Sequence, residues 1–387
     1  TLGFAHNFAA SADGRMSVMD YPHPTLEETN GTISLENAYA TGIGEWDKVT
    51  VAYSYSAIPP ETDASNFLKG ILREAQQRGL HYISDSDARA AGGAHATAHL
   101  WDNGENAATE LNRVLELRAS AIQNFSQDNI RNDEPYTVLE DVFVPLYFYH
   151  RYQMEAASKM IGGLNYTYAV KGDDQLIVET LDRTTQIMAL EALLKTMDAS
   201  SLAIPKDKLK LFPPRAYNYN RSRESFKSHN GVAFDALAAA ETAADLTLSF
   251  LLHPQRANRL VHQKALDSDN LGLAEVLDQL YEQSFSSSSD RKDSYHQEID
   301  QVVQYRIIQH LFNLATHKNT IPQTKALAYQ TLQKIHDQAA NSSGANAAYI
   351  IYQIENFKRK PEDFKVMPSL KIPDGSPIGS TNCYTHE

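Results

Sequence analysis

The chain has 387 residues, of which 42% are hydrophobic, so it is long enough to bury a substantial core and to hold two or three domains. Its formal net charge is −13, and no run of lysine or arginine is long enough to follow a phosphate backbone, which argues against nucleic acid as a partner. No uninterrupted apolar stretch approaches the length of a membrane span, and a single cysteine, Cys383, excludes an intrachain disulfide.

The first pattern with chemical content lies at the start of the chain. Residues 1–8 read TLGFAHNF, residues 17–21 read SVMDY, and residues 44–55 read GEWDKVTVAYSY. Gly3 and His6 have the spacing of the last two fixed positions in H-E-x-x-H-x-x-G-x-x-H. In that pattern two histidines share one helix face, the glycine lets the chain leave the helix, and the third histidine completes the metal site.

Together the three segments resemble the bacterial Met-zincin family of zinc-dependent metalloproteases, in the metzincin clan. The resemblance is close over residues 1–55 and rests elsewhere on general character and on short pieces such as HLWDNG at 99–104. It implies that His6 is the third zinc ligand and that Gly3 and Met19 are structural, with Met19 forming an apolar floor beneath the imidazoles. It also implies that Tyr21 donates a hydrogen bond to the developing oxyanion, although Asp20 stands where the astacin form has a histidine.

The resemblance further implies an endopeptidase that hydrolyses protein or peptide substrates with water activated by zinc. This chain is then a C-terminal fragment that begins just after the HExxH motif, and we expect it to be inactive and to lack zinc. No export signal is present in this chain, so its location is inferred from the family alone. The resemblance implies an extracytoplasmic location, whether periplasmic, cell-surface or secreted.

Each of these residues also has an ordinary structural interpretation. His6 can be a loop histidine, Met19 a core methionine and Tyr21 a turn aromatic before a proline. Packing alone does not require G-x-x-H and S-x-M-x-Y together, so we favour the functional interpretation. His23, between two prolines, is expected at the surface or the rim of a cleft.

Helical patterns dominate beyond residue 57. Residues 61–80 predict an amphipathic helix with Thr62 or Asp63 as the N-cap and Gly79 as the stop. A long structured loop over 81–104 follows, and then come expected helices at 105–125 and at 136–161, the second kinked by Pro145.

The loop at 81–104 contains a second metal candidate. His95 and His99 have the i, i+4 spacing of a two-histidine metal site, and Asp85, Asp87 and Asp102 are near in sequence. The segment lacks the glutamate of HExxH, and its two adjacent glycines weaken the helix that would align the imidazoles. We favour a loop that packs beside the cleft.

The rest of the chain predicts a mainly α fold in which a multi-helix bundle or irregular helical domain follows the end of a metzincin catalytic domain. We expect the domains at 1–57 and 58–387, with a candidate subdivision near 205–232. The expected elements are a minor β element near 165–178, helices at 181–197, 233–252, 255–265, 270–285, 293–316, 322–339 and 345–357, an irregular excursion over 206–230, a serine-rich break at 284–289, and an extended tail from Pro361.

Two other functions fit the helical region. It can be a protein- or cell-surface-binding module without catalysis, or a structural domain that supports the catalytic cleft. A groove that leads from His6 would favour substrate binding, whereas a separate apolar patch would favour a partner.

Overall fold

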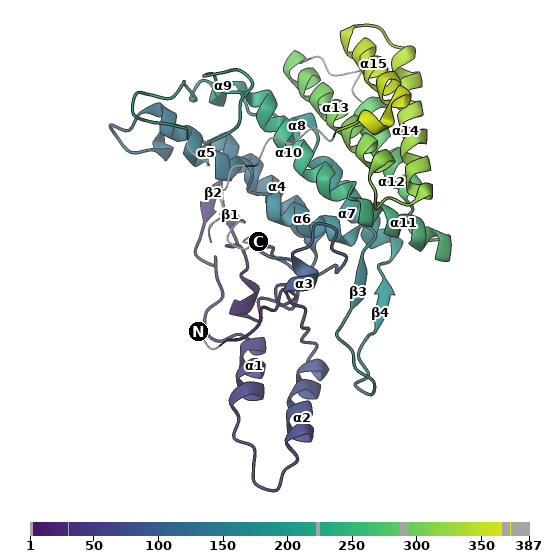
Figure 1. Ribbon diagram of the computed structural model, residues 1–387. Coiled ribbons are helices and arrows are strands. Elements are labelled where there is room, and N and C mark those ends of the chain that lie inside the picture. Colours follow the sequence, from purple (N-terminus) through teal and green to yellow (C-terminus); the bar gives the residue numbers. More distant parts are fainter. Residues whose placement is uncertain (1–2, 30, 222–224, 287–292, 366–371, 373–387) are drawn as a thin grey trace. The chain divides into compact units, whose positions relative to one another are not determined.

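The computed structural model describes residues 3–29, 31–221, 225–286, 293–365 and 372, and most of them are helical (Figure 1). This confirms the predicted mainly α class. The chain forms two compact units: unit 1 comprises Thr1–Arg113 and Tyr152–Ala192, and unit 2 comprises Val114–Arg151 and Leu193–Glu387. Most of the predicted tail and part of the serine-rich break lie outside the described residues.

Unit 1 contains short helices, two β-hairpins and long connecting segments. Helices α4 (Ala107–Asn124) and α7 (Arg183–Lys195) belong to both units along the chain, and α6 (Arg151–Met160) lies almost wholly in unit 1. The other elements of unit 1 are η1 (Val18–Asp20), β1 (Glu27–Thr29), β2 (Thr32–Ser34), α1 (Glu45–Tyr55), α2 (Ala64–Gln77), α3 (Asp85–Ala88), β3 (Leu164–Tyr166) and β4 (Val178–Thr180).

Helices α1 and α2 lie side by side and pack through a small apolar cluster (Figure 1). Val49, Ala75 and Leu80 are buried there, with Trp46 and Ile71 packed against them. Asp63 caps α2 by accepting a hydrogen bond from the Asn66 amide at 2.8 Å. The helix predicted at 61–80 therefore forms from 64 to 77, after one of its two predicted caps.

Both hairpins are short antiparallel pairs. Strands β3 and β4 pair Leu164 with Thr180 and Tyr166 with Val178, in the region where a minor β element is predicted. Strands β1 and β2 were not expected, because each has only three residues, too few for a pattern of alternating apolar and polar residues to be recognised. The Asn30-Gly31 dipeptide between them is the one local signal for that hairpin.

A buried cluster fixes the N-terminal segment within unit 1. Phe8 and Ala9 pack with Ile83, Ala88 and Ala98, all of them almost fully buried. The Phe8 amide also donates to the Ile83 carbonyl at 2.8 Å. The segment that carries His6 thus lies along residues 81–83, which hold it by both packing and hydrogen bonding.

Unit 2 is a stack of helices in which α10, α13, α14 and α15 pack successively against one another (Figure 1). Its elements are η2 (Gln127–Asn129), η3 (Tyr136–Val138), α5 (Leu139–Tyr147), α8 (Ala199–Leu202), α9 (Lys206–Leu209), α10 (Ala236–Leu251), α11 (Pro254–Leu266), α12 (Leu273–Tyr281), the π-helical η4 (Glu282–Ser286), α13 (Ser294–Thr316), α14 (Pro322–Ala340), α15 (Ala345–Arg359) and η6 (Pro361–Asp363).

The helix that is predicted over 136–161 forms as two helices. Pro145 lies inside α5, which ends at Tyr147, and the next helix begins at Arg151. The missing proline amide removes one hydrogen bond within α5, and the helix ends two residues later.

Candidate active site

His6 lies beside two aromatic rings and one carboxylate. Its Nδ1 atom is 2.8 Å from one carboxylate oxygen of Asp85 and 3.0 Å from the other. Its ring centroid is 5.0 Å from that of Phe8 and 5.1 Å from that of Tyr21. The His6 side chain is 23% exposed, so most of its surface is covered by protein and a smaller part is open to solvent.

The next residue, Asn7, anchors the segment. Its fully buried side chain donates from Nδ2 to the His81 carbonyl at 2.7 Å, and its Oδ1 accepts from the Ile83 amide at 3.1 Å. The Asn7 amide donates to the Met19 carbonyl at 3.2 Å. One residue therefore links His6 both to the 81–83 segment and to the methionine turn.

Asp85 is a charged partner for His6. It opens α3 and also accepts a hydrogen bond from Arg89 Nε at 2.6 Å. Partial burial disfavours its charge, but hydrogen bonds from Arg89 and His6 outweigh that effect and lower the pKa of Asp85. Because an ionised carboxylate can only accept hydrogen bonds, His6 Nδ1 carries a proton and donates it to Asp85.

The turn at 17–21 is held by α1. Ser17 Oγ accepts from the Met19 amide at 3.0 Å and donates to Asp47 Oδ1 at 2.6 Å. The Val18 amide donates to Asp47 Oδ2 at 3.1 Å. Tyr21 ends the turn in the left-handed region, with φ at 56°. Asp47 thus explains physically why the GEWD segment accompanies the SVMDY segment: its carboxylate satisfies the turn.

Gly3 and Met19 support this arrangement through the backbone. Gly3 has φ at 76°, where a residue with a Cβ atom would be strained. The Met19 carbonyl is the acceptor that binds the Asn7 amide. The structure therefore brings His6, the backbone of Met19 and Tyr21 close together.

A buried acidic pair lies next to the turn. Asp20 is fully buried, and its carboxylate oxygens have no hydrogen-bond partner among the described residues. Burial raises its pKa to about 8, although Ser11 opposes the rise. Asp102 is also buried, accepts from Ser11 Oγ at 3.4 Å, and has its pKa raised well above the ordinary value by burial and by Asp20. At neutral pH, Asp20 is therefore mostly protonated.

His95 and His99 have different surroundings. His95 is buried, with its Nε2 at 2.8 Å from the Tyr166 carbonyl and its Nδ1 at 3.3 Å from the Thr97 amide. His99 is buried, with Nε2 at 3.7 Å from Glu155, and burial lowers the pKa of both histidines. In the part of the chain that the structure describes, no group of three or more His, Cys, Asp or Glu side chains is arranged to hold a metal ion.

Sequence reasoning did not find the link between Asp85 and His6. The two residues are 79 positions apart, and the sequence places Asp85 near His95 alone. Asn7 has no signal in the sequence beyond its place next to His6. No local pattern reports either contact, because both depend on the N-terminal segment lying along residues 81–85.

His6, Tyr21 and the backbone of the turn that contains Met19 lie close together in unit 1. The Met-zincin family model matches residues 1–292. That match covers well over half of the 387 residues, and the chain belongs to the Met-zincin family. No curated protein and no solved structure matches the chain.

None of the described helices is both long enough and apolar enough to cross a membrane.

Proposed function

We propose that this chain supplies the third ligand and the methionine turn of a zinc metalloendopeptidase. The observation that carries the proposal is the pairing of His6 Nδ1 with Asp85 at 2.8 Å, which leaves Nε2 without a partner among the described residues, while the His6 and Tyr21 ring centroids lie 5.1 Å apart. Metal-binding histidines typically donate their other ring N–H to a carboxylate or carbonyl group. A loop histidine with no metal role does not require that arrangement.

The described residues fit only part of a zinc site, because His6 is one imidazole and no three-ligand group surrounds it. We propose that the other two histidines and the glutamate lie in an HExxH motif on residues that precede Thr1, so this chain alone is inactive. Bound zinc would supply an activated water. This chain's own contributions are then orientation of His6 by Asp85, support of the turn by Asp47, and a phenol hydrogen bond from Tyr21.

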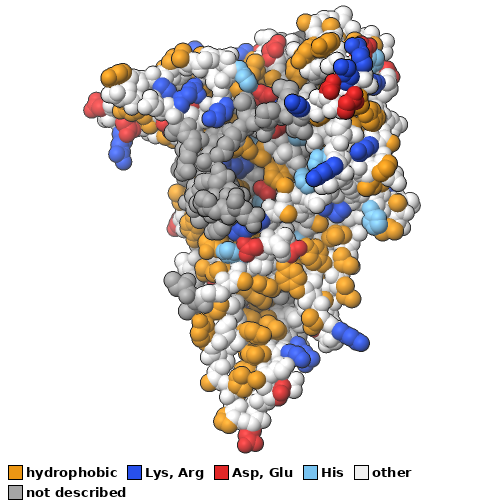
Figure 2. All heavy atoms as spheres, in the orientation of Figure 1, with side chains coloured by type: hydrophobic (Ala, Val, Ile, Leu, Met, Phe, Trp, Pro, Cys, Tyr) orange, Lys and Arg blue, Asp and Glu red, His pale blue; other side chains and the backbone are white. Residues whose placement is uncertain are grey.

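The surface of unit 1 supports a further packing partner from the same catalytic domain. Figure 2 shows hydrophobic side chains gathered over the α1 part of the molecule. Large apolar side chains between residues 35 and 58 are strongly exposed: Leu35, Tyr39, Ile43, Val51, Tyr53, Tyr55 and Ile58. An exposed apolar surface of this kind favours coverage by protein, and we propose that the remainder of the catalytic domain covers it.

The proposed substrate is a polypeptide, and we propose an extracytoplasmic location by family membership. The net charge of −13 argues against nucleic acid as a partner.

A binding module without catalysis is the second candidate for unit 2. It is favoured by an exposed cluster of tyrosines, in which Tyr349 lies 5.4 Å from Tyr305 and 6.3 Å from Tyr352 between ring centroids. Tyr349 is 48% exposed and Tyr352 is 62% exposed. Exposed tyrosines are typical of protein interfaces. Loss of partner binding in a Tyr349→Ala, Tyr352→Ala variant that keeps peptidase activity would support this role.

The test of the peptidase proposal compares this chain with the protein extended upstream to include HExxH. We expect chelator-sensitive cleavage of casein and stoichiometric zinc only in the extended protein, and loss of both in its His6→Ala variant. His262→Ala, an exposed histidine of unit 2, is the matched control and should leave both unchanged. Chelator-sensitive cleavage by the short chain, or full activity of the extended His6→Ala variant, would contradict the proposal.

A further inference from the structure

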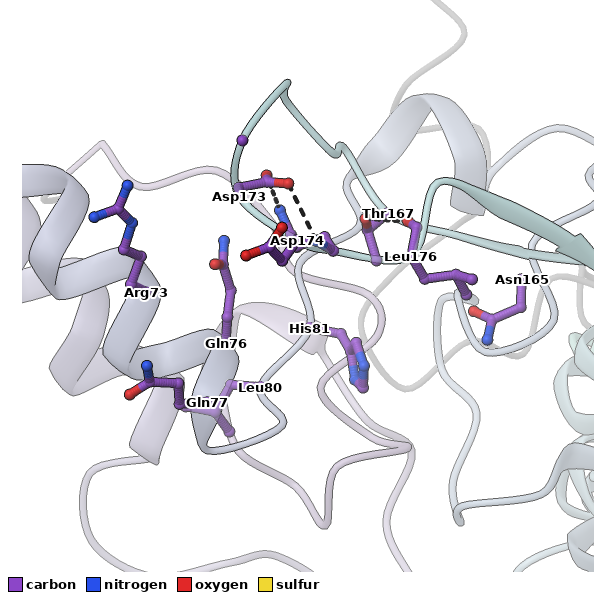
Figure 3. Close-up of a pocket in the computed structure, with 12 residues that line it drawn as sticks. Arg73, Gln76, Gln77, Leu80, His81, Asn165, Thr167, Asp173, Asp174 and Leu176 are labelled. Atoms are coloured by element: carbon purple, nitrogen blue, oxygen red, sulfur yellow. Dashed lines mark hydrogen bonds between the residues drawn. The ribbon is translucent and has the colours of Figure 1, made fainter.

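Unit 1 contains a groove between α2 and the turn that joins β3 to β4. Its larger part has a volume of about 570 Å³ and its smaller part about 220 Å³, and the two parts share Arg73, Gln76 and Gln175. Figure 3 shows Arg73 and Gln76 on α2 facing Asp173 and Asp174 of the turn. The larger volume lies within the range of small-ligand and short-peptide sites.

Three cations border this groove in a chain with a net charge of −13. Lys69 and Arg73 are one helical turn apart on α2, and Lys171 lies on the opposing turn. Within the described residues, none of the three has an ion-pair or hydrogen-bond partner. Their positive charges are therefore available to an anionic ligand.

The acidic side chains of the groove are fewer than its cations. Asp173 accepts from the Val170 amide at 2.9 Å and from the Gln175 amide at 3.2 Å, and these bonds lower the pKa of Asp173. Its carboxylate thus closes the turn. His81 is paired with Asp13 at 2.9 Å, so its charge is matched. Asp174 is the other acidic side chain of the lining, so three cations face two carboxylates.

The other lining groups suit a peptide. Gln76 and Gln77 have amide side chains without partners in the described part of the chain, and an amide both donates and accepts, as a peptide group does. The smaller part adds the apolar side chains of Leu72, Tyr168 and Val170. A compact inorganic anion would use the cations but would leave the amides and the apolar part of the groove without contacts.

The groove is connected to the candidate site through residues 81–85. The Ser84 amide donates to the Tyr168 hydroxyl at 3.1 Å, and Tyr168 lines the groove. Ser84 directly precedes Asp85, the partner of His6, and the His81 carbonyl receives the Asn7 side chain. A ligand in the groove would therefore contact Tyr168, which is hydrogen-bonded to the segment that orients His6.

We propose that this groove binds an extended acidic segment of a polypeptide. Its carboxylates pair with Lys69, Arg73 and Lys171, and its backbone contacts the glutamine amides. Only the identification of that polypeptide as a peptidase substrate rests on the proposed function. The binding itself is a property of this chain.

The test is fluorescence anisotropy with a short fluorescein-labelled peptide of alternating glutamate and leucine. Arg73→Glu should weaken binding by about tenfold or more, since each tenfold corresponds to roughly 1.4 kcal/mol. Asp174→Asn should tighten binding, because it removes the unpaired acid. Lys318→Glu, a charge-matched change at an exposed lysine of unit 2, should have no effect, and circular dichroism should show every variant folded.

Two further arms identify the ligand. The same peptide with glutamine in place of glutamate should bind weakly, and inorganic phosphate should not displace the acidic peptide at matched ionic strength. Equal binding by wild type and Arg73→Glu would overturn the proposal, and so would displacement by phosphate. Because this assay needs no zinc or catalysis, its failure is distinguishable from failure of the peptidase proposal, which is measured as casein cleavage.

Discussion

The buried carboxyl group of Asp20 makes unit 1 sensitive to pH in a direction opposite to that of most acidic residues. The folded pKa is about 8, whereas the ordinary value is 3.8, and the main cause is burial. For an acid whose pKa is raised by folding, stability is fully present below the ordinary pKa and is lost as pH rises toward the folded value. We predict that Asp20→Asn, which imitates the protonated acid, removes this loss.

The expected magnitude follows from proton linkage. Wild type should lose about 1.4 kcal/mol relative to Asp20→Asn for each pH unit between about 4 and 8. The difference should be flat below that window and constant above it. Asp102 reinforces the effect, because the charge of Asp20 also raises the pKa of Asp102.

The assay is denaturant unfolding followed by tryptophan fluorescence from pH 4 to 9. The chain has two tryptophans, Trp46 and Trp101, and both lie in unit 1, so the signal reports that unit alone. Ser228→Ala, at a half-buried serine in unit 2, is the control and should follow the wild-type curve, because the signal comes from unit 1. Parallel pH profiles for wild type and Asp20→Asn would refute the reasoning about this buried acid.

Three further predictions concern single contacts. Asp47→Ala removes the acceptor for the Ser17 hydroxyl and the Val18 amide, so it should lower the free energy of unfolding of unit 1, followed by tryptophan fluorescence, by about 1–3 kcal/mol. Hydrogen exchange at the Val18 amide should become faster, and unchanged exchange would show that Asp47 does not support the turn. Asp85→Asn should shift the His6 ring from the Nδ1–H tautomer to a mixture by nitrogen NMR and weaken zinc binding of the extended protein about 10- to 100-fold; an unchanged tautomer would remove Asp85 from the site. Asp235→Ala removes the N-cap of α10 and should lower the free energy of unfolding of unit 2, measured by circular dichroism, by about 1–2 kcal/mol. The unfolding transition of unit 1, measured by tryptophan fluorescence, should not change, and a shift of both transitions would show that the units do not unfold separately.

The helices could be predicted because their signals are local. The helix predicted at 322–339 forms over Pro322–Ala340, with proline at its first position, and α2 begins directly after the predicted cap Asp63. Spacing of apolar residues by 3.6 and the identity of cap residues depend only on neighbours in sequence.

The hairpin of β1 and β2 was not predicted, because its strands lack a strong local signal. Each strand has three residues, and those of β1 are all exposed, so no buried face imposes an alternating pattern. Short strands of this kind depend on the turn, for which Asn30-Gly31 was the available signal.

The candidate site also has a part that local sequence signals predict and a part that they do not. Gly3, His6, Met19 and Tyr21 were found because a compact motif carries them, and the Asp47 segment was found because it accompanies that motif. The contact between His6 and Asp85 joins residues 79 positions apart and depends on how the N-terminal segment packs. The domain boundary at 57/58 and the roles of these residues stay predictions.

The most direct test of His6 as a zinc ligand is anomalous diffraction at the zinc edge on crystals of the protein extended upstream and loaded with zinc. We predict a single strong peak about 2.0–2.1 Å from His6 Nε2, with His6 Nδ1 still bonded to Asp85. A zinc peak elsewhere, for example between His95 and His99, with none at His6, would contradict the assignment.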